Sequence, residues 1–273
     1  MEKYRIRYAF YVPAVILFLN SIPGVRERDF SNLEVLLYGA SPISEDVLLT
    51  AKDIFKCQFI QVYGLTETCG AGTILEPEDH DPSLGRLRSC GKVAPTAELK
   101  IVDSKGNSLG PNEVGEITYR SKSVMKGYWK NEEATKKSIS SGWFSTGDAG
   151  YLDADGYLYI HDRIKDMIVS GGENVYPAEV ENALFDHPAI GDVAVIGVPD
   201  GKWGEAVKAV VVLKPGAEAT EDEIISYSRT KIAGYKIPKS IDFTDVLPRN
   251  PTGKLLKREL RKPYWQGKDR QIN

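Results

Sequence analysis

The densest group of chemically useful residues lies between residues 162 and 181, where fixed charges flank two adjacent glycines. Gly171 and Gly172 permit a tight turn with positive φ and let another molecule approach the backbone closely. Pro177 suits the first turn of a following helix. The pattern predicts a hinge beside a phosphorylated ligand. From the residues alone, Arg163 also fits a surface charge, and the glycine pair also fits a plain hairpin.

A second candidate site places a hydroxyl and a carboxylate just after a predicted strand, in the run Tyr63-Gly64-Leu65-Thr66-Glu67. Mg²⁺ takes oxygen ligands while it bridges phosphates, so this pair suits a nucleotide and its metal ion. A bare Thr-Glu pair is more often a helix cap. The run Gly39-Ala40-Ser41-Pro42 follows another predicted strand, and taken alone it indicates a turn.

Lys254 ends the run Asn250-Pro251-Thr252-Gly253-Lys254, which has the Gly-Lys pair of a Walker loop. A Walker loop needs another glycine upstream and a Ser or Thr after the lysine, where this chain has Leu255. The sequence therefore argues against a Walker loop, and a lysine in this setting is usually solvated surface.

Hydrolase chemistry has little support in the sequence. The three histidines are scattered, and none has an evident Ser, Cys or carboxylate partner for a nucleophilic triad. They are His80, His161 and His187.

Composition and charge narrow the class of protein. The 273 residues are 42% hydrophobic and 27% charged, which is typical of a globular chain long enough for more than one domain. A net charge of -3 with interspersed signs gives no basic patch for nucleic acid or membrane lipid. Cys57, Cys69 and Cys90 lack the number and spacing of a disulfide framework or zinc site, so we expect a reducing cytoplasm.

The apolar run at residues 8–19 follows a basic start, as in a signal peptide, but Pro13 interrupts it. The run is also too short to span a bilayer, so we expect it to lie in a core and predict no transmembrane segment.

Hydrophobic periodicity predicts an α/β start, with helices at 13–19 and 44–56 and buried strands at 34–38 and 59–63. Ser44 is the expected N-cap of the second helix. The two glycine-containing runs described above then follow strand ends, and in open α/β sheets ligands usually bind beyond the carboxyl ends of strands.

The rest of the chain predicts two further parts. Strands at 97–102, 114–119 and 157–160 indicate a β-barrel-like subdomain. After Arg163 we expect a small α+β domain with strands at 192–198 and 207–213. Its helix would run from Thr220 to Ile232, with a Thr220 and Glu223 capping box and Gly234 as its stop. We thus divide the chain into residues 1–162 (1–84 α/β, 85–162 β-rich) and a mobile domain at 163–273, with a hinge near 163–166.

Five runs occur in a fixed order: residues 38–42, residues 63–68, Ser145-Thr146-Gly147-Asp148, residues 162–181, and residues 251–254. On these runs the sequence resembles the adenylate-forming enzymes, which include acyl-CoA synthetases, aryl-CoA ligases, firefly luciferase and the adenylation domains of peptide synthetases. The resemblance runs almost end to end. It looks closest to bacterial fatty-acid CoA ligases, judging by residues 166–174 and 260–265.

The resemblance implies an ATP or AMP site made from Gly39, Ala40, Ser41, Tyr63, Gly64, Thr66, Asp148, Arg163 and Lys254. Within it Thr66 would contact phosphate and Glu67 would bind Mg²⁺. Asp148 would accept hydrogen bonds from both ribose hydroxyls, since an ionised carboxylate is a pure acceptor. Arg163 would add guanidinium donors to the ribose and its phosphate.

The resemblance also implies motion. Lys254 would be the catalytic lysine, carried to the α-phosphate by the mobile domain, and Lys165 would be the pivot. Residues lining the path for CoA would be Gly171, Gly172, Trp203, Tyr235 and Lys239. The alternative for Trp203 is that it only covers the core.

These expectations combine into an acid:CoA ligase that converts a carboxylic acid, a fatty acid or a relative of one, and ATP to acyl-AMP and then acyl-CoA. Two alternatives stay open. The acceptor could be a carrier-protein thiol, or the chain could be a non-catalytic fragment that binds nucleotide or CoA.

One family feature is missing. A Ser/Thr/Gly-rich phosphate loop of the type T-S-G-T-T-G-x-P-K-G precedes the first run in family members, and residues 1–39 contain none. We therefore expect an acyl-CoA synthetase-like fold that is partial, an incomplete enzyme, and a missing N-terminal part that could exist as a separate chain.

Overall fold

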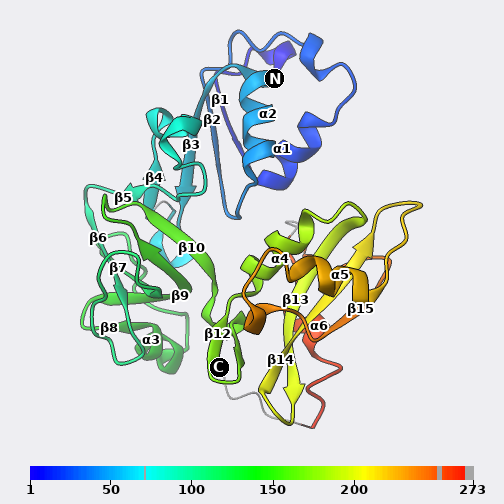
Figure 1. The fold of residues 1–273 in the computed structure, drawn as a ribbon. Helices are drawn as coiled ribbons and strands as arrows, with labels where there is room; N and C mark the ends of the chain where they lie inside the picture. The colour runs from blue at the N-terminus through cyan, green and yellow to red at the C-terminus, as the bar shows by residue number, and fades with distance from the viewer. Residues whose placement is uncertain (71, 251–253, 268–273) are drawn as a thin grey trace. The chain divides into compact units, whose positions relative to one another are not determined.

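The computed structural model describes residues 1–70, 72–250 and 254–267, and it divides the chain into two compact units, residues 1–160 and 161–273 (Figure 1). Within the described residues, no helix has the length and apolar character needed to cross a membrane.

The first unit begins with a five-stranded sheet of order β1-β2-β3-β4-β5. Strands β1 to β3 are parallel, and β4 and β5 continue the sheet antiparallel. The strands are β1 (Tyr8–Tyr11), β2 (Val35–Gly39), β3 (Gln58–Tyr63), β4 (Thr73–Leu75) and β5 (Lys92–Val93). The crossover helices are α1 (Pro13–Asn20) and α2 (Glu45–Phe55). The predicted α/β start is thus confirmed, except that β1, β4 and β5 were not expected as strands.

Helix α2 forms where the sequence predicts it. The hydroxyl oxygen of Ser44 accepts a hydrogen bond from the Val47 N–H, and two acidic residues in the first turn complement the helix dipole. Its apolar side packs with α1 on one face of the first sheet. The core there includes Ile16, Leu36, Tyr38, Leu48, Phe55 and Phe59.

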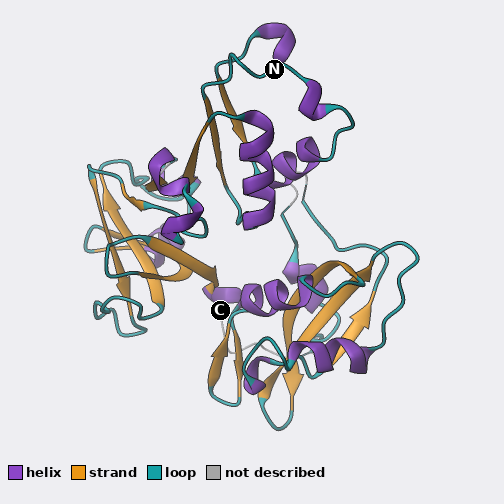
Figure 2. Cartoon of the chain, turned by 45° about the horizontal axis from the view of Figure 1, so that its top comes forward, coloured by secondary structure: helices purple, strands orange, loops and turns teal. Residues whose placement is uncertain are grey.

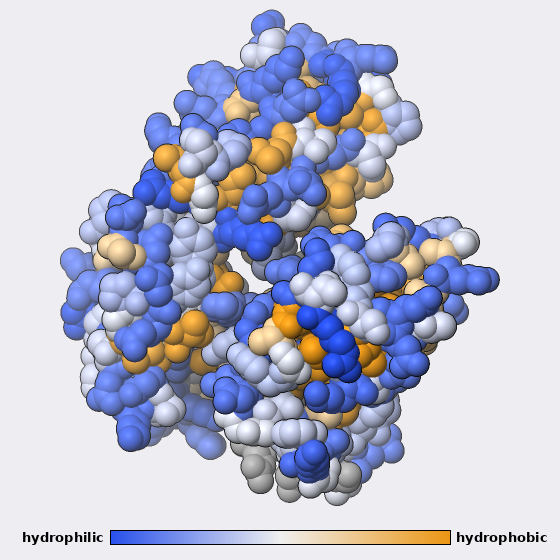
Figure 3. Space-filling view, viewed as in Figure 1, coloured by the Kyte–Doolittle hydropathy of each residue, from blue (hydrophilic) through white to orange (hydrophobic). Residues whose placement is uncertain are grey.

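The opposite face of this sheet is also apolar. The register aligns Phe10 with Leu37, and Leu37 with Ile60, so the three side chains form one row across three strands. Phe10 is 55% exposed, and Leu37 and Ile60 are half-buried. Val15 does not belong to this row, because it lies on α1, which covers the other face. Figure 3 shows hydrophobic patches interrupting the charged surface of this unit.

The rest of the first unit is a second five-stranded sheet of order β10-β9-β7-β6, with β8 paired to β9. Its strands are β6 (Ala97–Val102), β7 (Gly115–Ser121), β8 (Ile139–Ser140), β9 (Trp143–Leu152) and β10 (Leu158–Arg163), and α3 (Glu132–Ser138) precedes β8. The predicted strand-rich part is present, but in the described residues it forms an open sheet rather than a closed barrel, because β10 and β6 are its two edges.

The second unit is a five-stranded sheet with helices on it (Figure 2). The sheet has the order β12-β11-β14-β13, and β15 pairs with β14. Its strands are β11 (Ile168–Ser170), β12 (Glu173–Val175), β13 (Ile190–Asp200), β14 (Gly204–Leu213) and β15 (Ser240–Phe243). The helices are α4 (Pro177–Phe185), α5 (Glu221–Ser228) and α6 (Lys257–Arg261). This arrangement is the expected small α+β domain.

Both faces of the unit-two sheet are packed. One face carries α4 and α5, with Val180, Leu184 and Ile224 in its core. The other face packs against Leu247, Leu255, Leu260 and Tyr264 from the C-terminal segment. That second contact holds these four residues on the sheet.

Helix α5 begins with the predicted capping box, since Thr220 and Glu223 each bond the other's backbone N–H. It ends at Ser228 rather than at the predicted Ile232. The chain leaves the helix through tighter turns, in which the N–H of Thr230 bonds to the Tyr227 oxygen and that of Lys231 to the Ser228 oxygen. Gly234 therefore opens a separate 3₁₀ turn instead of ending α5.

Candidate active site

Two backbone runs meet at the carboxyl edge of the first sheet, because β2 and β3 are parallel neighbours and Gly39 is paired with Val62. A β-carbon on Gly39 would lie 2.2 Å from the Val62 oxygen, and one on Gly64 would lie 1.5 Å from the Gly70 oxygen. Ala40 holds φ at 68°, which is uncommon for a residue with a side chain. The strand ends thus present close-packed, strained backbone at the edge where ligands usually bind.

Asp148 of β9 is brought to the end of β3. The hydroxyl of Tyr63 donates a hydrogen bond to Oδ2 of Asp148, over 2.7 Å. Asp148 is only 6% exposed. Burial raises the pKa of Tyr63, and the neighbouring Asp148 charge raises it further, so the phenol stays a donor.

The stretch of β9 that carries Asp148 is itself held by hydrogen bonds. Thr146 Oγ1 donates to the Ile117 oxygen over 2.7 Å and accepts from the Asp148 N–H over 3.1 Å. Gly147 takes φ at 70°, and its N–H donates to Glu116 over 3.2 Å. Burial raises the pKa of Glu116, the Gly147 bond opposes this, and the Asp148 charge adds to it. The Asp148 carboxylate therefore has a fixed backbone and an acidic neighbour.

Thr66 and Glu67 lie on a 3₁₀ turn, Thr66–Thr68, beyond the end of β3. Thr66 is exposed. Glu67 accepts a hydrogen bond from the Tyr128 hydroxyl over 2.9 Å, and its carbonyl accepts one from the Met125 N–H over 2.7 Å. Tyr128 is a contact that the sequence did not predict, because it lies 61 residues further along the chain with no spacing signal.

Among the described residues, no three His, Cys, Asp or Glu side chains cluster in a way that could hold a metal ion. A single carboxylate such as Glu67 fits an ion that takes its remaining oxygens from phosphate and water, as Mg²⁺ does in nucleotide sites. The donor set therefore suits a metal that arrives with a nucleotide.

The remaining candidates belong to the second unit. Arg163 is half-buried and Lys165 is exposed, on the 3₁₀ turn Ile164–Asp166. The N–H of Met167 bonds to the carbonyl oxygens of both Arg163 and Ile164, each over 3.1 Å. Lys165 thus sits in a compact turn between β10 and β11.

Gly171 and Gly172 form the predicted hairpin between β11 and β12, with φ at 63° and 88°. The N–H of Gly171 bonds to the Trp203 oxygen over 2.8 Å, and a β-carbon on Gly171 would lie 2.7 Å from the Trp203 ring. Lys239 lies over that ring, with Nζ 5.9 Å from its centroid. The structure thus joins the glycine turn to a half-exposed aromatic ring and a lysine.

Lys202 adds a second ammonium 4.6 Å from the centroid of the Trp203 ring. Tyr235 lies on the 3₁₀ turn Gly234–Lys236, which contacts β12, and it is 42% exposed. Aromatic rings and ammonium groups together can take a base and phosphates.

Lys254 is exposed at the end of a short hairpin. Its N–H bonds to Oδ1 of Asn250 over 2.8 Å, its carbonyl accepts from the Asn250 N–H over 2.9 Å, and Arg249 pairs with Leu255. Pro251, Thr252 and Gly253 of the motif lie outside the described residues.

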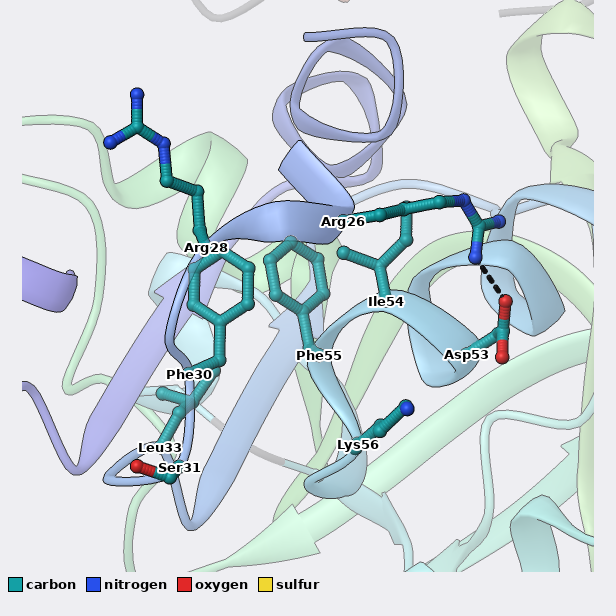
Figure 4. A pocket seen from close by; sticks show the side chains of 9 residues that line it. All are labelled: Arg26, Arg28, Phe30, Ser31, Leu33, Asp53, Ile54, Phe55 and Lys56. Carbon is teal, nitrogen blue, oxygen red and sulfur yellow. Dashed lines mark hydrogen bonds and ion pairs between the residues drawn. The ribbon is translucent and has the colours of Figure 1, made fainter. Parts of the chain in front are cut away.

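A pocket of about 320 Å³ lies elsewhere in the first unit (Figure 4). It is open and polar, and an Arg26–Asp53 ion pair crosses its rim. Leu33 and Lys56 in its wall lie two residues before the first residues of β2 and β3, so the pocket lies at the amino ends of these strands. The candidate residues are at the carboxyl ends, and we therefore separate this pocket from the site.

Two family models match the chain. The one described as AMP-binding enzyme matches residues 1–129, and the one described as AMP-binding enzyme C-terminal domain matches residues 179–254. Candidate residues 39–67 lie within the first match, and Trp203, Tyr235, Lys239 and Lys254 lie within the second. Asp148, Arg163, Lys165, Gly171 and Gly172 lie between the two matches.

Curated relatives match over nearly the whole chain. A fatty acid acyl-carrier-protein ligase, ScoC from Streptomyces coeruleorubidus, is 41% identical over 268 residues, covering 98% of this chain and 52% of the relative. Long-chain-fatty-acid CoA ligase FadD13 from Mycobacterium tuberculosis is 42% identical over 255 residues, covering 93% and 49%. The ATP-bound structure of MatB from Rhodopseudomonas palustris aligns with a TM-score of 0.87 at 32% identity, covering 96% and 51%. The chain spans about half the length of these proteins.

Proposed function

This chain belongs to the adenylate-forming superfamily of AMP-binding enzymes, and from that premise we propose that it carries the nucleotide-binding half of an ATP-dependent acid:CoA ligase. The acid's carboxylate attacks the α-phosphate of ATP, which gives acyl-AMP and releases pyrophosphate. The thiol of CoA then attacks the acyl carbon of acyl-AMP, which gives acyl-CoA and releases AMP. The acid we propose is a fatty acid or a related carboxylic acid.

The observation that carries this proposal is the buried Asp148 carboxylate, fixed by Tyr63 beside the glycine-containing strand ends. A carboxylate that is already partly desolvated and oriented loses little entropy when it accepts two ribose hydroxyls. The backbone of Gly39, Ala40 and Ser41 would then border the adenine.

Glu67 and Thr66 would receive the triphosphate end of the nucleotide. Glu67 would hold Mg²⁺, which when bound would supply positive charge to neutralise the phosphate oxygens. Tyr128 holds the Glu67 carboxylate in one orientation before the nucleotide arrives.

Lys254 would stabilise the charge that develops at the α-phosphate in the first step only. A rotation of the mobile domain about Lys165 would then remove Lys254 from the reacting group and bring the Gly171-Gly172 hairpin there in its place. That hairpin has no side chains at its tip, so it leaves room for the pantetheine arm of CoA. Domain closures of this kind commonly gate turnover.

The test is a nucleotide titration of the full enzyme and its Asp148→Asn variant, in which the second carboxylate oxygen becomes an amide donor. We expect the affinities for ATP and for acyl-AMP to fall together, because both ligands share the ribose. Asp46→Asn, an exposed aspartate of the same unit, is the control and should bind normally. Unchanged ATP affinity in the Asp148 variant would remove Asp148 from the site and overturn the proposal.

A carrier-protein thiol is the second candidate acceptor, because the ScoC ligase is 41% identical to this chain and the FadD13 ligase is 42% identical. Offering CoA and a phosphopantetheinyl carrier protein to the acyl-AMP-loaded enzyme separates the two. The preferred thiol will show the larger kcat/KM.

We also propose that the enzyme includes an N-terminal part which covers the open face of the first sheet. Parallel strands are usually covered on both faces, whereas the row Phe10, Leu37 and Ile60 has Phe10 55% exposed. The 273-residue chain should then associate with itself on its own and turn over acid, ATP and CoA negligibly. Robust acyl-CoA formation by the purified chain would contradict this part.

A further inference from the structure

Helix α6 contacts the turn that contains Lys165 through two ion pairs. The two cations are four residues apart on α6, and their two aspartates are four residues apart in the chain around Lys165. Nζ of Lys257 lies 3.4 Å from Oδ2 of Asp162, and Nη1 of Arg261 lies 2.6 Å from Oδ1 of Asp166. All four side chains are buried to a similar degree, between 11% and 14% exposed. Because residues four apart lie on one side of a helix, α6 presents both cations to the same short turn.

Lys257 has a second carboxylate partner. Its Nζ lies 2.9 Å from Oε1 of Glu181 on α4, and that carboxylate also accepts the Val195 N–H over 2.7 Å. Asp162 in turn accepts the N–H of Ala178, in the first turn of α4, over 2.9 Å. We call the pairs of Lys257 with Asp162 and Glu181, and the pair of Arg261 with Asp166, the α6 ion pairs.

The Lys257 ammonium is charged although it is desolvated. Burial by itself lowers the pKa of Lys257, but Glu181 and Asp162 outweigh it and the pKa is raised, so the ammonium stays charged. Removing one partner of such a cluster would leave an uncompensated buried charge. Breaking one of these contacts is therefore costly, which opposes separation of α6 from the turn.

The same helix follows Lys254 by three residues. The hairpin that carries Lys254 is closed by the bond from the Leu256 N–H to the Pro248 oxygen, and an Arg249–Asp192 ion pair of 2.7 Å fixes it to β13. Leu256 directly precedes α6. A displacement of α6 would thus move the base of the Lys254 hairpin.

We propose that Lys257 and Arg261 are positioning residues that couple the Lys165 turn to the Lys254 hairpin, so that the two open and close as one body. This inference rests on the proposed function for the roles of Lys165 as pivot and Lys254 as catalytic lysine. Arg261 holds the side of the turn that follows Lys165, and Lys257 holds the side that precedes it. Lys257 also pairs with Glu181. It therefore still has a carboxylate partner when a rotation about Lys165 moves Asp162 away from it.

The test is hydrogen exchange of backbone amides in the 273-residue chain without substrates. Its outcome does not depend on whether the chain transfers acyl groups, so a failure of the coupling is distinct from a failure of the proposed ligase. Two amides report: that of Met167, bonded across the Lys165 turn, and that of Leu256, bonded at the base of the Lys254 hairpin. Amides of the β13–β14 ladder are the reference for global opening.

Arg261→Met keeps apolar bulk and removes the charge. We expect both reporter amides to exchange on the order of 10-fold faster while the ladder reference is unchanged. Arg261→Lys restores a cation and should bring both amides back toward the wild-type rate, which a role limited to packing would not require. Arg258→Met on the exposed side of the same helix is the matched control and should alter neither amide.

Faster exchange at Met167 alone, or at neither amide, would overturn the coupling. Equal acceleration of the ladder would overturn it too, because the pair would then only stabilise the whole unit. If Arg261→Met fails to fold, Asp166→Asn removes the other partner of the same contact with little change of shape. It must then accelerate both amides, and unchanged exchange in that variant rejects the proposal. Lys257→Met, with exposed Lys262→Met as its control, repeats the test on the other side of the turn.

Discussion

The phenol of Tyr63 and the carboxylate of Asp148 meet across 2.7 Å although 85 residues separate them in the chain. The contact joins the end of β3 in the first sheet to the middle of β9 in the second. It thereby fixes the position of the proposed ribose acceptor relative to the strand ends that would border the adenine. The orientation of the Asp148 carboxylate therefore depends on the packing of the two sheets.

Replacing Tyr63 by Phe should weaken nucleotide binding without unfolding the protein. The ring keeps its packing, and the Asp148 carboxylate loses a donor. Loss of a hydrogen bond to a charged group is worth about 1.5 kcal/mol or more, so the ATP dissociation constant should rise about 10-fold. Calorimetric titration of the full enzyme measures this. Tyr4→Phe, at an exposed tyrosine of the same unit, should bind ATP normally, and an equal loss in both variants would show that the Tyr63 contact is irrelevant.

Glu67→Gln should raise the Mg²⁺ concentration needed for adenylation. The amide keeps the hydrogen bond from Tyr128 in reach but removes the negative charge that an Mg²⁺ ligand supplies. We expect the half-saturating Mg²⁺ concentration to rise on the order of 10-fold, about 1.4 kcal/mol. Pyrophosphate release at varied Mg²⁺ measures it. A Glu67→Gln enzyme with an unchanged Mg²⁺ requirement would place the ion elsewhere.

Lys254→Ala should separate the two half-reactions. Loss of one preorganised donor to charge made during adenylation should cost about 3 kcal/mol, a rate loss on the order of 10². Thioester formation from supplied acyl-AMP and CoA should stay near normal. Equal loss in both steps would mean that Lys254 serves both arrangements or only the structure. The lysine beyond α6, Lys262, offers the control substitution, since it is exposed in the same segment.

Gly171→Ala should show the opposite pattern. A β-carbon there would lie 2.7 Å from the Trp203 ring, and φ at 63° already disfavours a side chain. Displacing the ring disturbs the proposed pantetheine path, so we expect thioester formation to fall on the order of 10-fold while adenylation is little changed. Gly106→Ala carries the same backbone strain at φ of 84° with open space around it, which makes it the matched control. Comparable losses in both variants would assign the effect to backbone strain.

The first unit should lose stability in mild acid because of His80. Its Nδ1 donates to the Glu76 oxygen over 2.8 Å, and Nε2 accepts from the Tyr38 hydroxyl over 3.0 Å, so the neutral ring is fully bonded. Burial lowers the pKa of His80 below its ordinary 6.5, and Lys52 adds to this while the Glu76 bond and Asp79 oppose it.

A lowered pKa means that the unfolded chain takes up the proton first. The stability is therefore complete above pH 6.5 and is lost as the pH falls from there toward the folded pKa. The slope should approach about 1.4 kcal/mol per pH unit. Hydrogen exchange of the β2–β3 amides between pH 7.5 and 5.5, after correction for the intrinsic rate, measures it. His80→Gln should flatten the slope, and His187→Gln in the other unit should not.

Local patterns predicted the parts of the fold that local physics decides. Ser44 caps α2, Pro177 begins α4, and Thr220 with Glu223 begins α5. Those signals act within three or four residues. The strand β1 was missed because Tyr8 to Tyr11 runs straight into a helical apolar stretch, and only pairing with β2 makes it a strand.

The contacts within the candidate site could not be predicted in the same way. Sequence runs named Asp148 and Glu67, but the partners that orient them, Tyr63 and Tyr128, lie 85 and 61 residues away. No periodicity links residues at such distances, and the pairing depends on how the two sheets of the first unit pack. The open second sheet differs from the expected barrel for the same reason, since strand content does not determine closure.

The α6 ion pairs also set an order of events during synthesis. Lys257 and Arg261 each lie 95 residues after the aspartates that they hold. A chain that emerges from its N-terminus can close the first unit early, because its strands and helices alternate over short separations. The turn around Lys165 is synthesised long before Lys257 and Arg261, so its aspartates lack these two cation partners until residue 261 has left the ribosome. Because Lys254 lies three residues before α6, it is placed only in the last stage of folding.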